Sequence, residues 1–385
     1  ADAKAAINEA YRINPKSPHV FYTYWKMHNK DASEADTAKA MSEVLALKPV
    51  TLLDHTAHAL AHKTCKNLAG AIEVYKQALA MEQFKDSFEL HDNLAGLLYS
   101  TKRFEDAAAY YRAAVAIEKK HALGWSHLGN SLMELGRNAE AEAACRKAVQ
   151  LVPKDTDYLH NLANSLDRQQ KYAKSIEAEK QILKLDPSNA EAHHGISVSI
   201  KHIADRDLKS KPKAYQKELE KALAENELAL AQEPDNILYL SGKADTLITL
   251  GRFKEALDVA LKVSVLFEKM DEEERVDLED GLPFVKRIAE DEKSKLVSKI
   301  GIVPAKLQQM KEHIEKSLDD SGTEGHDSPK AGSGKDSPKL SDSGTSDHSD
   351  LDQHTSNGGH FDTHGVVDGT HDTLSGLIDD GGPFV

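Results

Sequence analysis

Three histidines in one segment form the first pattern whose residue types and spacing could carry chemistry. His55, His58 and His62 stand at i, i+3 and i+7, near one face of a helix, and Cys65 follows them. Imidazole and thiolate groups are the ligands that zinc prefers. Successive ligands on one helix, however, span too long an axial distance for a three-ligand site. We therefore expect an outward, polar helix surface and no metal, with metal binding as the open alternative.

Motifs of known catalytic sites are missing from the sequence. The chain has no phosphate-cradling G-x-x-x-x-G-K-[ST] loop, no G-x-S-x-G elbow and no H-E-x-x-H helix. Cys65 and Cys145 have no partner at zinc or redox spacing, which fits small buried apolar residues in a reducing compartment. We expect a protein that is not an enzyme and that needs no cofactor.

The net charge of −14 is distributed unevenly along the 385 residues. Residues 319–385 carry 14 acidic side chains and 3 lysines, which gives −11, so the preceding 318 residues carry only −3. Nucleic-acid binders need a basic excess, and a membrane span needs about 18 apolar residues in a row; the sequence offers neither. We expect no nucleic-acid partner, no membrane association, and a cytoplasmic location with the nucleus as the alternative.

The elements that must position any site recur along the chain. Pro15 and Pro49 are 34 residues apart, and so are Pro153 and the next helix-ending proline, Pro187. In the clearest unit, four residues of a first helix share one face at i, i+3, i+4 and i+7: Trp125, Leu128, Gly129 and Leu132. Gly136 supplies the turn, because glycine adopts the left-handed conformation without steric cost. A second helix then carries small residues inward: Ala141, Cys145 and Ala148.

These residues resemble the tetratricopeptide repeat, a helix–turn–helix of about 34 residues with the pattern W-x₂-L-G-x₂-Y, then Ala, an aromatic residue, Ala and Pro. Small residues such as Gly129 and Ala141 let the two helices approach closely. The resemblance implies an all-α fold: a right-handed α-solenoid of about seven such units. Capping helices and a disordered tail are expected to follow the array.

The predicted units begin with a partial repeat, 1–17, that holds only a second helix. The full units are 18–51, 52–87, 88–121, 122–155, 156–189, 190–236 and 237–270. Unit 190–236 is longer than the period, so we expect a lengthened helix pair or a protruding loop near Pro212. Residues 271–318 are predicted as capping helices and 319–385 as a disordered tail rich in acidic residues, Ser, Gly and His. The missing first helix and the initial Ala indicate a fragment of a longer protein or a natural half-repeat cap.

The resemblance also implies a function: an interaction scaffold that binds a peptide or partner protein in the concave groove lined by first helices. Groove-facing positions carry asparagines that look like the ladder of groove-binding family members: Asn93, Asn130, Asn161 and Asn164. Each amide offers a donor and an acceptor to a peptide backbone. Other side chains are expected to shape pockets along the groove: Trp125, His127, His160 and His194. The alternative is a solvated, idle face.

The sequence argues against one other function of such arrays and leaves two alternatives. A clamp for carboxylates needs lysine and arginine, whereas the corresponding positions hold Asp92, Ser126, Glu191 and Gly195, so acidic C-terminal tails are expected to bind poorly. One alternative is the targeting region of a larger enzyme such as a glycosyltransferase. Another is a structural protein that self-associates.

The tail holds patterns of its own. Ser328 and Ser337 each lie in Asp-Ser-Pro-Lys and resemble substrates of proline-directed kinases, so they are candidates for regulatory phosphorylation, with chance occurrence in a Ser-rich segment as the alternative. Six tail histidines interspersed with Asp are candidates for weak metal binding, although chance is the simpler explanation. A Gly-x-Pro-Phe-Val segment occurs twice, at 281–285 and 381–385, through chance duplication or as two copies that recognise the same kind of pocket.

Overall fold

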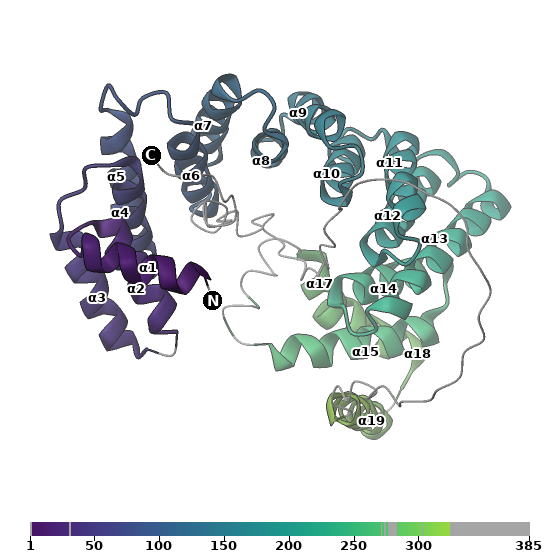
Figure 1. Cartoon of the computed structure of the whole chain (residues 1–385). Coiled ribbons are helices and arrows are strands. Elements are labelled where there is room, and N and C mark those ends of the chain that lie inside the picture. Colours follow the sequence, from purple (N-terminus) through teal and green to yellow (C-terminus); the bar gives the residue numbers. More distant parts are fainter. Residues whose placement is uncertain are drawn as a thin grey trace, which may run out of the picture. The chain divides into compact units, whose positions relative to one another are not determined.

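The computed structural model describes residues 2–30, 32–270, 272, 275, 283–302 and 304–323. The chain divides into two compact units at the boundary between Gly251 and Arg252. All regular elements within the described ranges are helices, so the predicted all-α solenoid fold is confirmed (Figure 1). The predicted phosphorylation sites, the tail histidines and the second Gly-x-Pro-Phe-Val copy lie outside these ranges.

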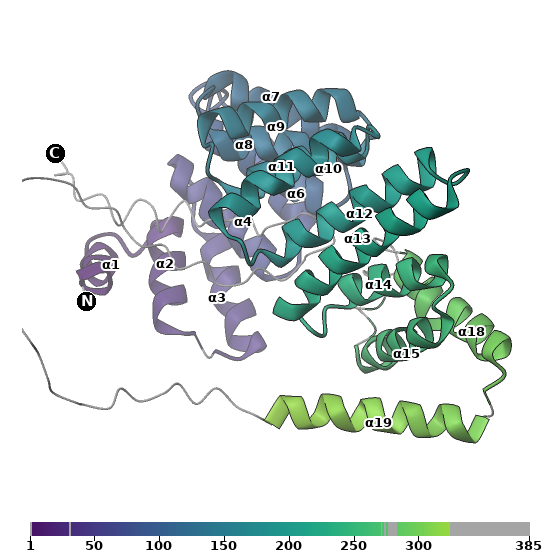
Figure 2. The same cartoon turned by 90° about the vertical axis from the view of Figure 1, so that its right-hand side faces the viewer.

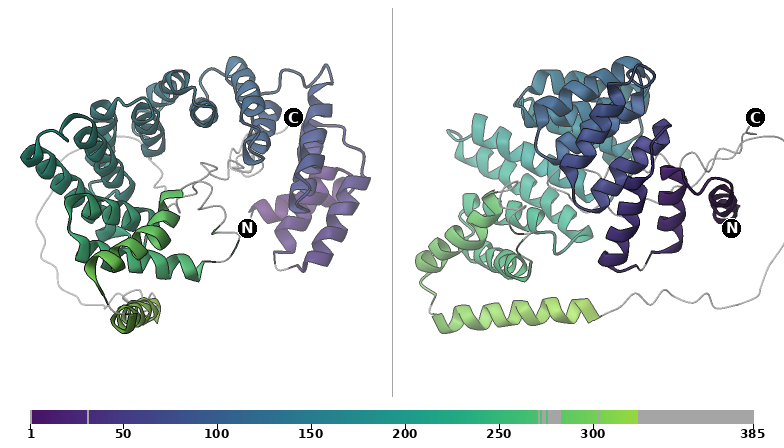
Figure 3. Two further views of the ribbon diagram at one scale, coloured as in Figure 1. Left: turned by 180° about the vertical axis from the view of Figure 1, so that it is seen from behind. Right: turned by 90° about the vertical axis from the view of Figure 1, so that its left-hand side faces the viewer.

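The first unit is a succession of helical hairpins (Figure 3). Its helices are α1 (Asp2–Ile13), α2 (Pro18–His28), α3 (Glu34–Ala46), α4 (Leu52–Thr64), α5 (Leu68–Leu79), α6 (Phe88–Ser100), α7 (Phe104–Ile117), α8 (Ala122–Glu134), α9 (Asn138–Leu151), α10 (Thr156–Asp167), α11 (Tyr172–Leu185), α12 (Ala190–Asp207), α13 (Pro212–Gln232) and α14 (Ile237–Leu250). Even-numbered helices from α4 to α12 are the first helices of hairpins. Each packs against its own second helix and against the next hairpin.

Local sequence signals begin and end the first helices. A polar side chain caps the N-terminus of each one from α2 to α14 by accepting a hydrogen bond from a backbone N–H, and in α4 Thr51 and Asp54 form a reciprocal capping box. The turn predicted at Gly136 is confirmed, since its φ is +69°. Lys66, Lys102 and Gln170 adopt the same left-handed conformation at the corresponding turns. The period of the array is therefore visible in backbone geometry as well as in sequence.

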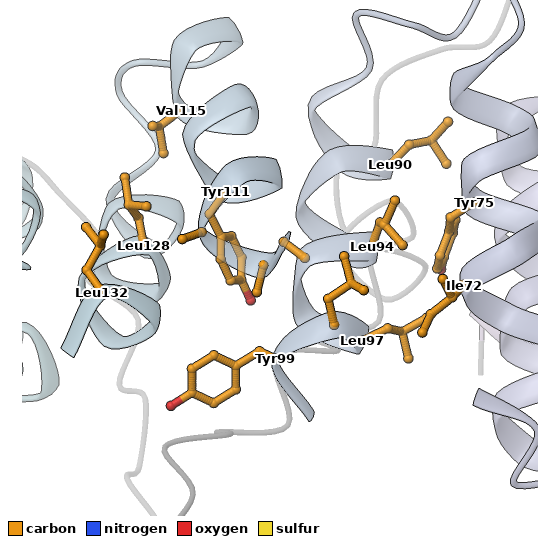
Figure 4. Close-up of a cluster of buried hydrophobic side chains, with 14 of the residues drawn as sticks. Ile72, Tyr75, Leu90, Leu94, Leu97, Tyr99, Tyr111, Val115, Leu128 and Leu132 are labelled. Atoms are coloured by element: carbon orange, nitrogen blue, oxygen red, sulfur yellow. The ribbon is translucent and has the colours of Figure 1, made fainter. Parts of the chain in front are cut away.

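A continuous apolar core joins the hairpins of α4 to α9. Tyr75 on α5 lies beside Leu94 of α6, and Tyr111 of α7 lies between α6 and α8 (Figure 4). Both tyrosines are at most 4% exposed. Gly129 supplies the close approach inside its hairpin, because a Cβ there would meet Cys145 Sγ at 2.5 Å. A larger residue at 129 would clash with Cys145 unless that side chain or the two helices shifted.

The lengthened unit 190–236 contains two long helices and no protruding loop. Helix α12 has 18 residues and α13 has 21. Pro212 occupies the first turn of α13, where its missing N–H costs no helical hydrogen bond. Between the two alternatives left open by the sequence, the structure therefore contains the lengthened helix pair.

The second unit contains α15 (Phe253–Lys269), α17 (Pro283–Arg287), the π-helix η1 (Ile288–Glu292), α18 (Lys293–Ile300) and α19 (Pro304–Thr323) (Figure 2). Its η1, α18 and α19 pack against α15. Two lysines make polar contacts to α15: Lys293 Nζ lies 2.6 Å from Ser264 Oγ, and Lys311 Nζ lies 2.7 Å from Glu268 Oε2. Among the helices that the structure describes, none combines the length and apolar character needed to cross a membrane.

Candidate peptide-binding surface

Three of the four ladder asparagines keep their side-chain amides available. Asn93, Asn130 and Asn164 stand on the consecutive first helices α6, α8 and α10, and within the described part of the chain none of their amides is hydrogen-bonded. Asn130 is half-buried, with its Oδ1 shielded from water. Asn164 is exposed. We call the side of α6, α8, α10 and α12 that carries the predicted binding residues the first-helix surface.

The fourth asparagine has an intramolecular partner. Asn161 Nδ2 donates a hydrogen bond of 2.9 Å to Ser126 Oγ on α8. Ser126 is only 2% exposed. This bond links two neighbouring first helices and uses one of the two donors of the amide, so Asn161 contributes to the packing of α8 with α10.

His160 lies within an ionic cluster rather than on an open surface. Its Nδ1 is 3.0 Å from Glu179 Oε1 on α11, and its Nε2 is 2.6 Å from Glu191 Oε1 on α12. Burial acts to lower the pKa of His160, but the two carboxylates outweigh it and raise that pKa well above its ordinary value. The imidazolium ion is thus held between two glutamates. Burial also raises the pKa of Glu179, although His160 opposes this shift.

His194 occupies the corresponding place on α12 but has a neutral partner. Its Nδ1 lies 3.3 Å from Asn226 Oδ1 on α13, and its ring lies 4.8 Å from that of Tyr239 on α14. Asn226 Nδ2 in turn donates to the carbonyl oxygen of Tyr239 at 2.9 Å. Burial lowers the pKa of His194 to about 4, against the effect of the Asn226 hydrogen bond. His194 is therefore neutral at physiological pH.

The remaining two predicted residues belong to α8. Trp125 is half-buried against the apolar core, and its Nε1 donates to the carbonyl oxygen of Lys119 at 3.0 Å. His127 lies 5.3 Å from the ring of Tyr111, and its Nδ1 is buried without a hydrogen-bond partner in the described chain. Burial lowers the pKa of His127 to about 4, with help from His121.

Polar contacts that the sequence analysis did not predict connect the later first helices. Arg168, which follows α10 directly, lies 3.0 Å from Glu134 on α8, and Ser199 on α12 donates to Asp167 on α10 at 3.0 Å. Lys201 on α12 lies 3.0 Å from Asp245 on α14. The partners are 32 to 44 residues apart, so a search for helical pairs at i, i+4 could not find them. Only Arg168 and Glu134 gave a signal, since they stand at the same position of consecutive repeats with opposite charges.

Two expectations for the histidine segment are wrong: that its histidines face outward, and that Cys65 is buried. His55 and His58 are 5% and 8% exposed, so they are buried in the hairpin contacts and do not form an outward polar surface. His62 instead contacts Asn67, with 3.2 Å between Nδ1 and Nδ2. Cys65 is exposed at the end of α4, whereas Cys145 is buried as expected. The described residues include no cluster of histidine, cysteine and acidic side chains suited to a metal ion.

Comparisons with known proteins identify the hairpins. The profile of the tetratricopeptide repeat family matches residues 56–122, 104–156 and 126–190. Among solved structures, a tetratricopeptide repeat protein from Parabacteroides merdae is 14% identical and has a TM-score of 0.49, over 68% of this chain and 98% of its own. PilF of Pseudomonas aeruginosa is 17% identical with a TM-score of 0.44, over 63% of this chain and 99% of its own.

A third solved structure is described as YrrB, a tetratricopeptide repeat protein with an unusual peptide-binding site. It is 18% identical with a TM-score of 0.36, over 56% of this chain and 97% of its own. No curated protein sequence matches the chain. The matched segment 56–190 coincides with the hairpins from α4 to α11. Residues 56–190 of the chain are tetratricopeptide repeats.

Proposed function

We propose that this protein is a non-catalytic interaction scaffold that binds an extended peptide of a partner protein across its first-helix surface. Arrays of this family typically act as protein-interaction scaffolds. One observation supports the location: Asn93, Asn130 and Asn164 present unpaired amides from three consecutive first helices. An amide can both donate to and accept from a peptide backbone, whatever the sequence of that peptide.

The spacing of the helices suits an extended ligand. Packed helices lie about 8–10 Å apart, and an extended chain advances about 3.3 Å per residue. A peptide that crosses α6, α8 and α10 would therefore meet one asparagine roughly every third residue. His160 and His194 have a different part in this proposal, because their ring nitrogens contact Glu179, Glu191 and Asn226. They support the helices beneath the surface.

Selection from a library of random 12-residue peptides tests the proposal. The full chain is expected to enrich a set of peptides, and Asn93→Ala/Asn130→Ala is expected to weaken them by roughly tenfold or more, since each lost hydrogen bond contributes about 1 kcal/mol. Asn14→Ala/Gln216→Ala is the matched control, because both amides are exposed and lie off the first-helix surface. If the enriched peptides bind all three proteins equally, the proposed surface is wrong.

We further propose that phosphorylation in the tail regulates this binding. Ser328 and Ser337 each precede Pro-Lys, and each phosphate would add about −1.5 to −2 charges at neutral pH. Incubation of the full chain with a proline-directed kinase, followed by mass spectrometry and the same peptide measurement, tests both steps. Unmodified serines, or modification without any change in affinity, would refute the regulatory role.

A further inference from the structure

Three half-buried side chains around α6 and α8 carry polar atoms that the protein itself does not satisfy. They are Asp92 on α6 and His127 and Asn130 on α8. Asp92 Oδ1, His127 Nδ1 and Asn130 Oδ1 are shielded from water and have no hydrogen-bond partner among the described residues. Folded proteins rarely leave such atoms unpaired, so each of them calls for a partner such as an ordered water, an ion or a ligand group.

Tyr111 of α7 lies near two of the three side chains, His127 and Asp92. Its ring centroid lies 5.3 Å from that of His127. Its hydroxyl oxygen lies 3.5 Å from where a Cβ on Gly96 would stand, one helical turn after Asp92. Burial raises the pKa of Tyr111 well above its ordinary value, and the negative charge of Asp92 adds to this shift. Helices α6 and α8 also contact each other directly, and Asn130 follows His127 by three residues, on the same face of α8.

The surroundings of Asp92 disfavour the ionised form of its carboxyl group. Burial, and then the nearby charge of Glu89, raise the pKa of Asp92 to about 7. Asp54, on the preceding first helix, shows the opposite arrangement. Its two oxygens accept hydrogen bonds from the hydroxyl of Ser17 and from three backbone N–H groups. Asp54 thus receives four hydrogen bonds, whereas Asp92 Oδ1 receives none from the described residues.

We propose that Asp92, together with Asn130 and His127, receives a lysine or arginine side chain of the peptide bound on the first-helix surface. The inference rests on the proposed function and adds the chemistry of the ligand. Asp92 and Asn130 offer oxygen acceptors, and an ammonium or guanidinium group supplies several donors to such atoms. A hydrogen bond between two charged groups is also stronger where water is partly excluded. An acidic ligand side chain would instead be repelled by Asp92 and Glu89.

Binding of a cation at this place is coupled to loss of the Asp92 proton. In the free protein the ionised fraction of Asp92 rises roughly tenfold between pH 6 and pH 8, because its pKa is about 7. His127 on α8 stays neutral over this range, since its pKa is about 4, and Tyr111 on α7 stays protonated. Glu89 on α6 adds negative charge. Affinity for a cationic ligand is therefore expected to rise roughly tenfold from pH 6 to pH 8.

Two small probes test the site directly in the full chain. The cationic probe is N-acetyl-lysine N-methylamide, and the neutral control of similar shape is N-acetyl-norleucine N-methylamide. Binding is followed at pH 8 through the NMR signals of the His127 ring and the Asn130 side-chain amide. We expect saturable shifts with the lysine probe and roughly tenfold weaker binding of the norleucine probe.

The variants separate a binding role from a structural one. Asp92→Asn should weaken the lysine probe roughly tenfold and remove the pH dependence. Asp167→Asn is the matched control, because Asp167 already accepts a hydrogen bond from Ser199 and should leave the probe unaffected. Equal binding of both probes, or a pH profile that survives in Asp92→Asn, would overturn the inference.

The failure of this inference can be told from that of the proposed function. If the random peptides bind and require Asn93 and Asn130 but show no preference for basic residues, the scaffold function stands and the cation site falls. If no peptide binds while the lysine probe still does, the cation site stands without the groove. A library selected on the full chain and enriched in lysine or arginine at one fixed position would support both.

Discussion

The hairpins formed by α4 to α7 and those formed by α10 to α13 have the same architecture but different interiors. Tyr75 and Tyr111 stand 23 residues after the start of their predicted units, at 52 and 88. Glu179 stands at the same offset from 156, and Asn226 does so from 190 once the 13 additional residues of that unit are subtracted. All four side chains are at most 4% exposed. One position of the repeat is therefore aromatic early in the array and polar later.

This difference shows that a polar side chain at this core position pairs with a side chain of a first helix. Glu179 has His160 as its counter-charge, and Asn226 bonds to His194. Gly195 provides the room, because a Cβ there would meet Glu179 Oε1 at 2.6 Å. In the aromatic region, Asp92 Oδ1 has no hydrogen-bond partner among the residues that the structure describes. In the polar region the buried carboxylate and amide thus have side-chain partners from first helices, although Glu179 Oε2 makes no hydrogen bond within the described chain.

The largest effect is expected from truncating Tyr111, the buried tyrosine between α6 and α8. Tyr111→Ala should lower the free energy of unfolding by about 4 kcal/mol, because it leaves a cavity between α6, α7 and α8. Urea unfolding followed by circular dichroism measures the loss. Tyr110→Ala, on the same helix but only partly buried, is the control and should cost much less. Equal losses would mean that Tyr111 is not a packing centre.

The ion pair between His160 and Glu179 should show coupling between its two side chains. Glu179→Leu is expected to destabilise the chain by about 3 kcal/mol, since His160 loses one of its two carboxylates inside the protein. Glu179→Leu/His160→Leu should cost less than the sum of the two single losses, because the two side chains are coupled, although Glu191 then loses its imidazolium partner. A double variant whose loss equals the sum of the two single losses would show that the pair is not coupled.

His160 and His194 allow the comparison to be extended to pH. The pKa of His194 is about 4 in the folded chain, so only the unfolded chain takes up this proton as the pH falls from 6.5. Stability is therefore lost toward acid, and His194→Gln should reduce the loss between pH 7 and pH 4.5 by about 2 kcal/mol. His160 has a raised pKa, so its contribution is complete below pH 6.5 and is lost as the pH rises through its folded value.

NMR titration of the imidazole signals checks the opposite directions of these two shifts. The ring of His194 should remain neutral at pH 6, while that of His160 should remain protonated above neutral pH. Similar titration of both rings near 6.5 would contradict the different environments that we assign to α10 and α12.

The sequence predicted the fold well because the residues that pack each hairpin lie within the same repeat. The glycine and alanine positions around Gly129 and Ala141 and the turn at Gly136 are local signals, and each was sufficient for one hairpin. The polar contacts depend on pairs that come from different repeats. Asn161 and Ser126 are 35 residues apart, and only the stacking of α8 on α10 brings them together. Residue types at first-helix positions indicated a surface, but they did not tell which side chains would bind one another.

The smallest expected effect compares two aspartates of neighbouring first helices. At pH 8 Asp92 is ionised without a donor from the described chain, so Asp92→Asn should raise the free energy of unfolding by about 1 kcal/mol. Asp54→Asn should lower it by about 1 kcal/mol, because its carboxylate accepts four hydrogen bonds and its pKa is lowered by them despite burial. Urea unfolding at pH 8 and pH 5 measures both variants. The folded chain binds a proton at Asp92 between pH 4 and 7 that the unfolded chain does not, so the gain from Asp92→Asn should shrink at pH 5. A loss of stability in Asp92→Asn at pH 8 would mean that this carboxylate serves the fold and is not reserved for a ligand.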